Sequence, residues 1–74
     1  MDSEYFAELF LQQHNKINGR GVFLYLIHTA IGQVWVVQWE QTGLELITKL
    51  FYNDMDGAQR YFKKQCAAIL NGRI

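Results

Sequence analysis

Cysteine, histidine, proline and net charge are all scarce or absent in this 74-residue chain. Cys66 is the single cysteine, which excludes an internal disulfide and is typical of a protein from a reducing compartment. Two histidines and one cysteine without close spacing do not make a zinc motif, so we expect no metal and no cofactor. A formal net charge of zero excludes a global field that would attract nucleic acid or an anionic membrane.

Catalytic groups are also missing. Neither a Ser-His-Asp set nor a glycine-rich phosphate loop can be assembled from this sequence. Cys66 as a nucleophile needs a neighbouring base and a partly exposed, electropositive site, and Lys63 is near it in helical spacing. The cysteine falls on an apolar helical stripe, however, which favours an inert core thiol. We expect a protein that is not an enzyme and has no small-molecule substrate.

No hydrophobic run is long enough to cross a membrane. The most apolar one, Val22 to Val37, is shorter than a span and contains His28, Gly32 and Gln33. The first residues, MDSEYFAEL, carry acids where a secretion signal would carry basic residues. We expect one domain over residues 1–74, located in the cytoplasm, with no membrane partner.

The chain does have abundant apolar and aromatic side chains. Half of its residues are hydrophobic and 15% are aromatic, a composition that excludes disorder. A chain of this length buries only roughly 60% of its unfolded surface and usually gains stability from a disulfide, a metal or an oligomer. With the first two excluded, self-association is the expected stabiliser.

The stretch from Val22 to Tyr52 predicts a β-sheet. It is rich in β-branched and aromatic residues, which suit a pleated and half-buried surface. Gly32 and Thr42-Gly43 divide it, because glycine accepts the backbone angles of turns. We expect a three-stranded antiparallel meander with strands at Val22 to Thr29, Gln33 to Glu40 and Leu44 to Tyr52.

A helix is predicted on each side of this sheet. Ser3 can cap the first one, which runs to Lys16 and ends at Asn18-Gly19. The second begins after Asn53 or Asp54 and ends at Asn71-Gly72. The apolar stripe of the first helix holds Phe6, Leu9, Phe10, Gln13 and Ile17, and that of the second holds Met55, Ala58, Phe62, Cys66, Ile69 and Leu70. The expected fold class is α+β, in the order α-β-β-β-α.

Both helices can cover one face of the sheet. The predicted core on that face comprises Leu24, Leu26, Trp35, Val37, Trp39, Leu46 and Leu50. The opposite face would then be a large apolar patch, which is typical of an interaction site. The predicted partner-binding residues are Phe23, Tyr25, Ile27, Val34, Val36, Ile47 and Phe51. We expect them to bind a second copy in a homodimer or another protein, as an adaptor or a stoichiometric inhibitor does.

The alternative is a nucleic-acid-binding domain. Its phosphate contacts would come from a basic cluster on the second helix and beyond it, and such a cluster gives weak, salt-sensitive binding. Phe23, Tyr25 and Phe51 could stack single-stranded bases. The basic cluster comprises Arg60, Lys63, Lys64 and Arg73.

The α-β-β-β-α order and the alanine-bearing last helix, AQRYFKKQCAAIL, resemble the double-stranded-RNA-binding domain. In that family lysines at the start of the last helix contact phosphates across a groove. The corresponding segment here, NDMDGAQ, is acidic, and the family's Gly-Pro-x-His loop is absent. The resemblance therefore implies the fold, and the use that some members make of it as dimerisation modules.

The strand-strand-strand-helix pattern from Val22 to Ala68 also resembles the WGR domain of DNA-repair polymerases. The Trp-Gly-Arg triplet of that family falls near Trp39, where this chain reads Trp39-Glu40-Gln41. The likeness implies the same arrangement of sheet and helix.

Overall fold

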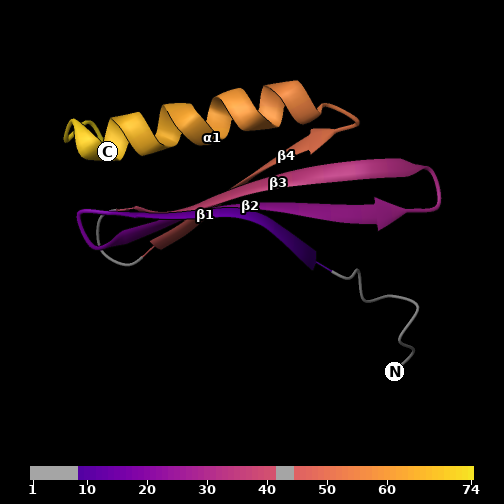
Figure 1. Cartoon of the computed structure of the whole chain (residues 1–74), viewed down its shortest axis with the longest axis horizontal. Coiled ribbons are helices and arrows are strands. Elements are labelled where there is room, and N and C mark those ends of the chain that lie inside the picture. The colour runs from indigo at the N-terminus through magenta and orange to yellow at the C-terminus, as the bar shows by residue number, and fades with distance from the viewer. Residues whose placement is uncertain (1–8, 42–44) are drawn as a thin grey trace.

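The computed structural model describes residues 9–41 and 45–74 and has the α+β class that the sequence predicts. Within these residues four strands form one antiparallel sheet in the order β1-β2-β3-β4, and one helix lies along one side of it (Figure 1). The elements are β1 (Leu9–Ile17), β2 (Arg20–Thr29), β3 (Gly32–Gln41), β4 (Glu45–Tyr52) and α1 (Met55–Leu70).

The predicted N-terminal helix is wrong over residues 9–16, because this segment forms strand β1. Residues 3–8 of that prediction lie outside the described residues. Asn18 and Gly19 do not end a helix: they form a tight turn between β1 and β2, with φ angles of 51° and 78°. Positive φ at both central residues suits the right-handed twist of the paired strands. The order of the described elements is therefore β-β-β-β-α.

A β-bulge at Gln12 explains why β1 resembles a helix in the sequence. Phe10 pairs with Leu26, and Ile17 pairs with Arg20, with an irregularity in register between Leu11 and Gln13. Two residues seven apart point to opposite faces of a regular strand, but one bulge brings them to the same face. A spacing of seven is also two turns of a helix, so the apolar pattern fitted both structures.

The predicted meander is confirmed, and its strands differ from the expected ones by a few residues at their ends. The turn predicted at Thr42-Gly43, together with Leu44, lies outside the described residues. At the start of β3, Gly32 has a φ of 142°, and a Cβ there would lie 2.5 Å from Asn53 Oδ1. Glycine is required at this position both by the backbone angle and by the space.

The C-terminal helix is confirmed together with its caps. The Asp54 carboxylate accepts a hydrogen bond of 2.9 Å from the Gly57 backbone N–H, and the Asn71 N–H donates to Ala67. No helix of the described residues is long and apolar enough to cross a bilayer. The buried residues of α1 are Ala58, Phe62, Gln65 and Ile69, whereas Met55 and Leu70, predicted to be buried, are 46% and 65% exposed.

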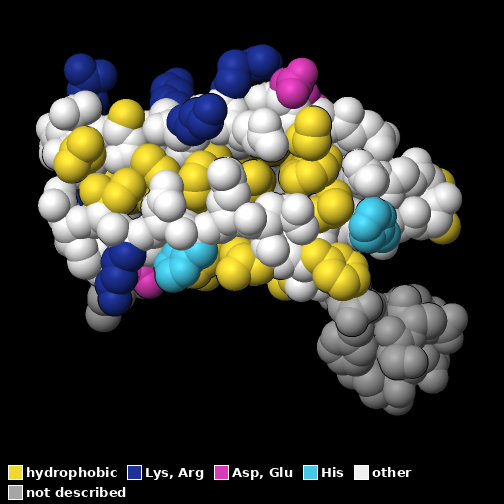
Figure 2. Space-filling view, viewed as in Figure 1, with side chains coloured by type: hydrophobic (Ala, Val, Ile, Leu, Met, Phe, Trp, Pro, Cys, Tyr) yellow, Lys and Arg dark blue, Asp and Glu magenta, His cyan; other side chains and the backbone are white. Residues whose placement is uncertain are grey.

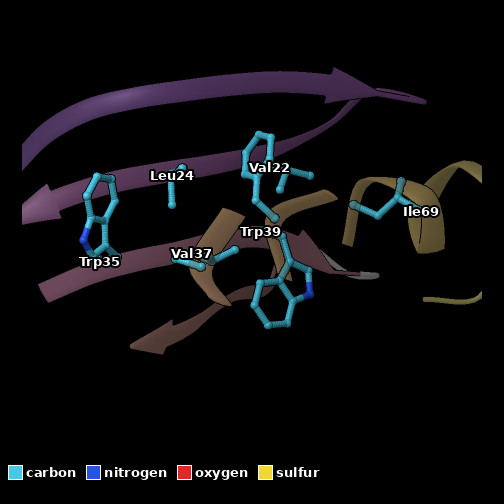
Figure 3. Close-up of a cluster of buried hydrophobic side chains, with 8 residues drawn as sticks. Val22, Leu24, Trp35, Val37, Trp39 and Ile69 are labelled. Carbon is cyan, nitrogen blue, oxygen red and sulfur yellow. The ribbon is translucent and has the colours of Figure 1, made fainter. Parts of the chain in front are cut away.

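The core lies between α1 and one face of the sheet, with Val22, Leu24, Trp35, Val37 and Trp39 packed against Ile69 and its helical neighbours (Figure 3). The predicted core is wrong for Leu46 and Leu50, which are 52% and 45% exposed. Ile47 and Phe51 pack against the core instead, because they pair with Trp39 and Trp35 in β3. Residues that pair across neighbouring strands share a face of the sheet, so the register of β4 decides which of its residues face the core.

Candidate protein-binding surface

The sheet face turned away from α1, here called the outer face, is arranged in cross-strand rows. The pairing register aligns Leu9, Ile27, Val34 and Tyr52 in one row and Leu11, Tyr25, Val36 and Leu50 in the next. Every member of both rows is apolar or aromatic. These eight residues are called the apolar patch.

The apolar patch is substantially open to solvent. Leu9 and Leu11 are 53% and 54% exposed, Leu50 is 45% exposed and Tyr52 is 68% exposed. Val36, at its centre, is 4% exposed because its row neighbours flank it. A contiguous apolar surface that crosses all four strands is much larger than the scattered apolar residues of an ordinary protein surface.

The other half of the outer face is more polar. His14, Phe23, Gln38 and Thr48 form the third row. His14 and Phe23 stack with ring centroids 4.5 Å apart, and Phe23 stacks on Tyr25 at 6.0 Å. These parallel rings make a flat strip between the polar half and the apolar patch.

The sequence correctly placed five of the seven predicted partner-binding residues on the outer face: Phe23, Tyr25, Ile27, Val34 and Val36. Ile47 and Phe51 are wrong, because they lie on the face covered by α1. Leu46 and Leu50 occupy the outer face in their place, as the register with Glu40 and Val36 shows.

Leu9, Leu11 and Tyr52 also belong to the outer face but were not predicted there. The signal for the two leucines was available, since Asn18-Gly19 between alternating apolar runs is typical of a hairpin.

A cleft of about 290 Å³ lies at the edge of the apolar patch, near the turn between β2 and β3. Its backbone polar groups already have partners: the Gln33 N–H donates to Asn53 Oδ1 at 2.9 Å, and the Asn53 N–H donates to the Gln33 carbonyl at 2.8 Å. Ile31 beside it is 93% exposed. The cleft therefore suits an apolar group better than a polar one. Its lining residues are Thr29, Ile31, Gly32, Gln33, Val34, Tyr52 and Asn53.

The basic residues predicted for nucleic-acid binding lie away from the outer face. Arg60, Lys63 and Lys64 are exposed on α1, and Lys and Arg side chains gather along the helix side of the molecule (Figure 2). Arg73 is exposed beyond the end of α1, whose last turn contains no basic residue. The cations and the aromatic strip of the outer face are thus on opposite sides of the sheet and do not form one surface.

Cys66 and the two histidines have structural surroundings. The Asn15 side-chain amide lies 3.5 Å from Cys66 Sγ and donates to it, which joins β1 to α1. His28 meets the ring of Phe10 edge-on at 5.8 Å. In residues 9–41 and 45–74, no group of three or more His, Cys, Asp and Glu side chains is placed to hold a metal ion.

The outer face thus presents an apolar surface across all four strands, on the side of the sheet away from α1. Comparison of the chain with models of protein families, with curated proteins and with solved structures found no match.

Proposed function

We propose that this chain is a non-enzymatic protein-interaction module and that the apolar patch is its binding surface. The observation that carries the proposal is the pair of fully apolar rows across all four strands, on the face that α1 leaves uncovered. Burial of apolar surface is worth about 25 cal/mol per Å², so a partner that covers these rows gains a substantial driving force. Such a module acts by stoichiometric binding, as an adaptor or an inhibitor does.

Tyr52 and Leu70 offer a matched test of this surface. Both are strongly exposed, at 68% and 65%, but Tyr52 lies in the apolar patch and Leu70 at the end of α1. A photo-cross-linking amino acid placed at position 52 in the producing cell should form covalent adducts with a protein, identified by mass spectrometry as a second copy or as another chain. The same group at position 70 should give few. Equal yields from the two positions, or no protein adduct from position 52, would refute the proposal.

Nucleic-acid binding is the alternative function, and it makes a different prediction. Phosphate contacts by Lys63 and Lys64 would give an affinity that falls steeply with salt and that drops when both are replaced by alanine. We favour a protein partner because the stacked aromatic rings of the outer face and these cations lie on opposite sides of the sheet. Salt-sensitive binding of single- or double-stranded probes, lost in the double alanine variant, would reverse that preference.

A further inference from the structure

The outer face has two unlike edges, one with exposed leucines and one beside a cleft. We propose that two copies of the chain pack outer face against outer face about a two-fold axis parallel to the strands. This inference rests on the proposed function, because it names a second copy as the partner of the same surface. This axis places β1 of each copy over β4 of the other. Each row of one copy then lies over the same row of the second copy with the strand order reversed, as a self-complementary interface requires.

The shapes of the two edges favour this arrangement. At the β1 edge Leu9 and Leu11 project into solvent, and at the β4 edge the cleft lies beside Val34 and Tyr52. Leu9 and Tyr52 occupy opposite ends of one row, so the axis brings Leu9 of each copy to the cleft of the other. A two-fold axis running across the strands would instead set the cleft of each copy over the opposite, more polar end of β3 and β4 in the other, away from Leu9.

The charges of the outer face fit the same axis. In residues 9–41 and 45–74 this face carries one basic and one acidic side chain, Lys16 and Glu40, near the end far from the cleft. Gly21 pairs with Lys16 on one side and donates its N–H to the Glu40 carboxylate at 3.1 Å on the other. Reversing this row sets Lys16 of each copy beside Glu40 of its partner, which gives two equivalent ion pairs at the rim.

The size of the face matches that of a small interface. Four strands about 4.8 Å apart, each contributing about eight residues at about 3.4 Å, cover roughly 500 Å² of flat sheet. Specific interfaces bury roughly 800 Å² per partner, so a dimer of this kind lies at the small end of their size range. Face-to-face packing of twisted sheets, with strands within about 30° of each other, is a common way to bury such surfaces.

Site-specific cross-linking tests the arrangement. Two single-cysteine chains, Leu9→Cys and Tyr52→Cys, are each made in a Cys66→Ser background so that the native thiol does not react. A mixture of the two, treated with a short bismaleimide, should give a covalent dimer that joins positions 9 and 52. Each chain alone should give little dimer, because the axis holds like positions at opposite edges. Dimers that join 9 to 9 or 52 to 52, or no dimer at all, would overturn the inference.

Charge reversal supplies a second, independent measurement. Lys16→Glu and Glu40→Lys should each weaken self-association at least tenfold, because each homodimer then faces like charges across the rim. Mixing the two variants should restore association, since one ion pair of the mixed dimer then has its native sign and the other has the reversed sign. A mixture no tighter than its components would contradict the proposed axis.

The outcomes separate this inference from the proposed function. If neither experiment detects a dimer while the photo-cross-linker at position 52 captures a different protein, the second copy is refuted as the partner. The apolar patch then remains the binding surface of an interaction module.

Discussion

Replacing Leu11 and Leu50 together by threonine should separate the two copies. These residues stand at the two ends of one row of the apolar patch and are 54% and 45% exposed. Complete burial of a leucine contributes about 1.5–3 kcal/mol, so covering the exposed half contributes about 1 kcal/mol. Four such leucines meet in a dimer, and threonine retains about a third of the effect. The expected loss is about 3 kcal/mol, or a dissociation constant roughly 100-fold higher.

Sedimentation velocity over a range of concentrations measures this change. The matched control is Met55→Gln with Leu70→Gln, which removes two apolar residues of similar exposure, 46% and 65%, from α1. The control should associate as the unmodified chain does, and circular dichroism should show that both double variants are folded. A Leu11→Thr/Leu50→Thr chain that associates as tightly as the control would refute the assignment of the interface to the outer face.

Three further substitutions test the fold that presents this surface. Asp54→Ala removes the side-chain cap of α1 and should lower the free energy of unfolding by about 1 kcal/mol in urea titrations; an unchanged midpoint would exclude a stabilising cap. Gly19→Ala forces a side chain into a φ of 78° and should cost about 1 kcal/mol by the same assay; an unchanged midpoint would contradict the left-handed backbone of this turn. Phe62→Ala empties a position that is 2% exposed and should cost about 3–5 kcal/mol, enough to abolish cooperative thermal unfolding; a sharp transition at the original temperature would contradict the packing of α1.

The C-terminal helix and the meander were predictable because their local signals agree with one another. Asp54 precedes the helical run and can cap it, and Asn71-Gly72 follows the run. Gly32 stands at a turn that only glycine fits well. Where propensity, capping and turn chemistry all favour the same structure, the sequence alone identifies the element.

The N-terminal strand was not predicted, because its apolar spacing fits two structures. Phe10 and Ile17 share a face in β1 only through the bulge at Gln12, and the same spacing of seven matches a helix. Asn18-Gly19 fits a helix end as well as a hairpin turn, and here the hairpin prevails because β1 pairs with β2 along its length.

The faces of β4 could not be assigned from alternation, since both sets of positions are apolar. Leu46 and Leu50 alternate with Ile47 and Phe51, so a shift of one residue exchanges the two sets. The pairing of Ile47 with Trp39 and of Phe51 with Trp35 decides the register, and with it the composition of the outer face. The excess of apolar residues thus predicted an apolar outer face, but the residues on that face were predictable only in part.

Sedimentation equilibrium of the unmodified chain tests the central claim most directly. If the outer face binds a second copy, the mass at micromolar concentration should approach twice the 8.7 kDa of one chain and fall on dilution. A single species of 8.7 kDa at every concentration would contradict the claim that the outer face binds a second copy.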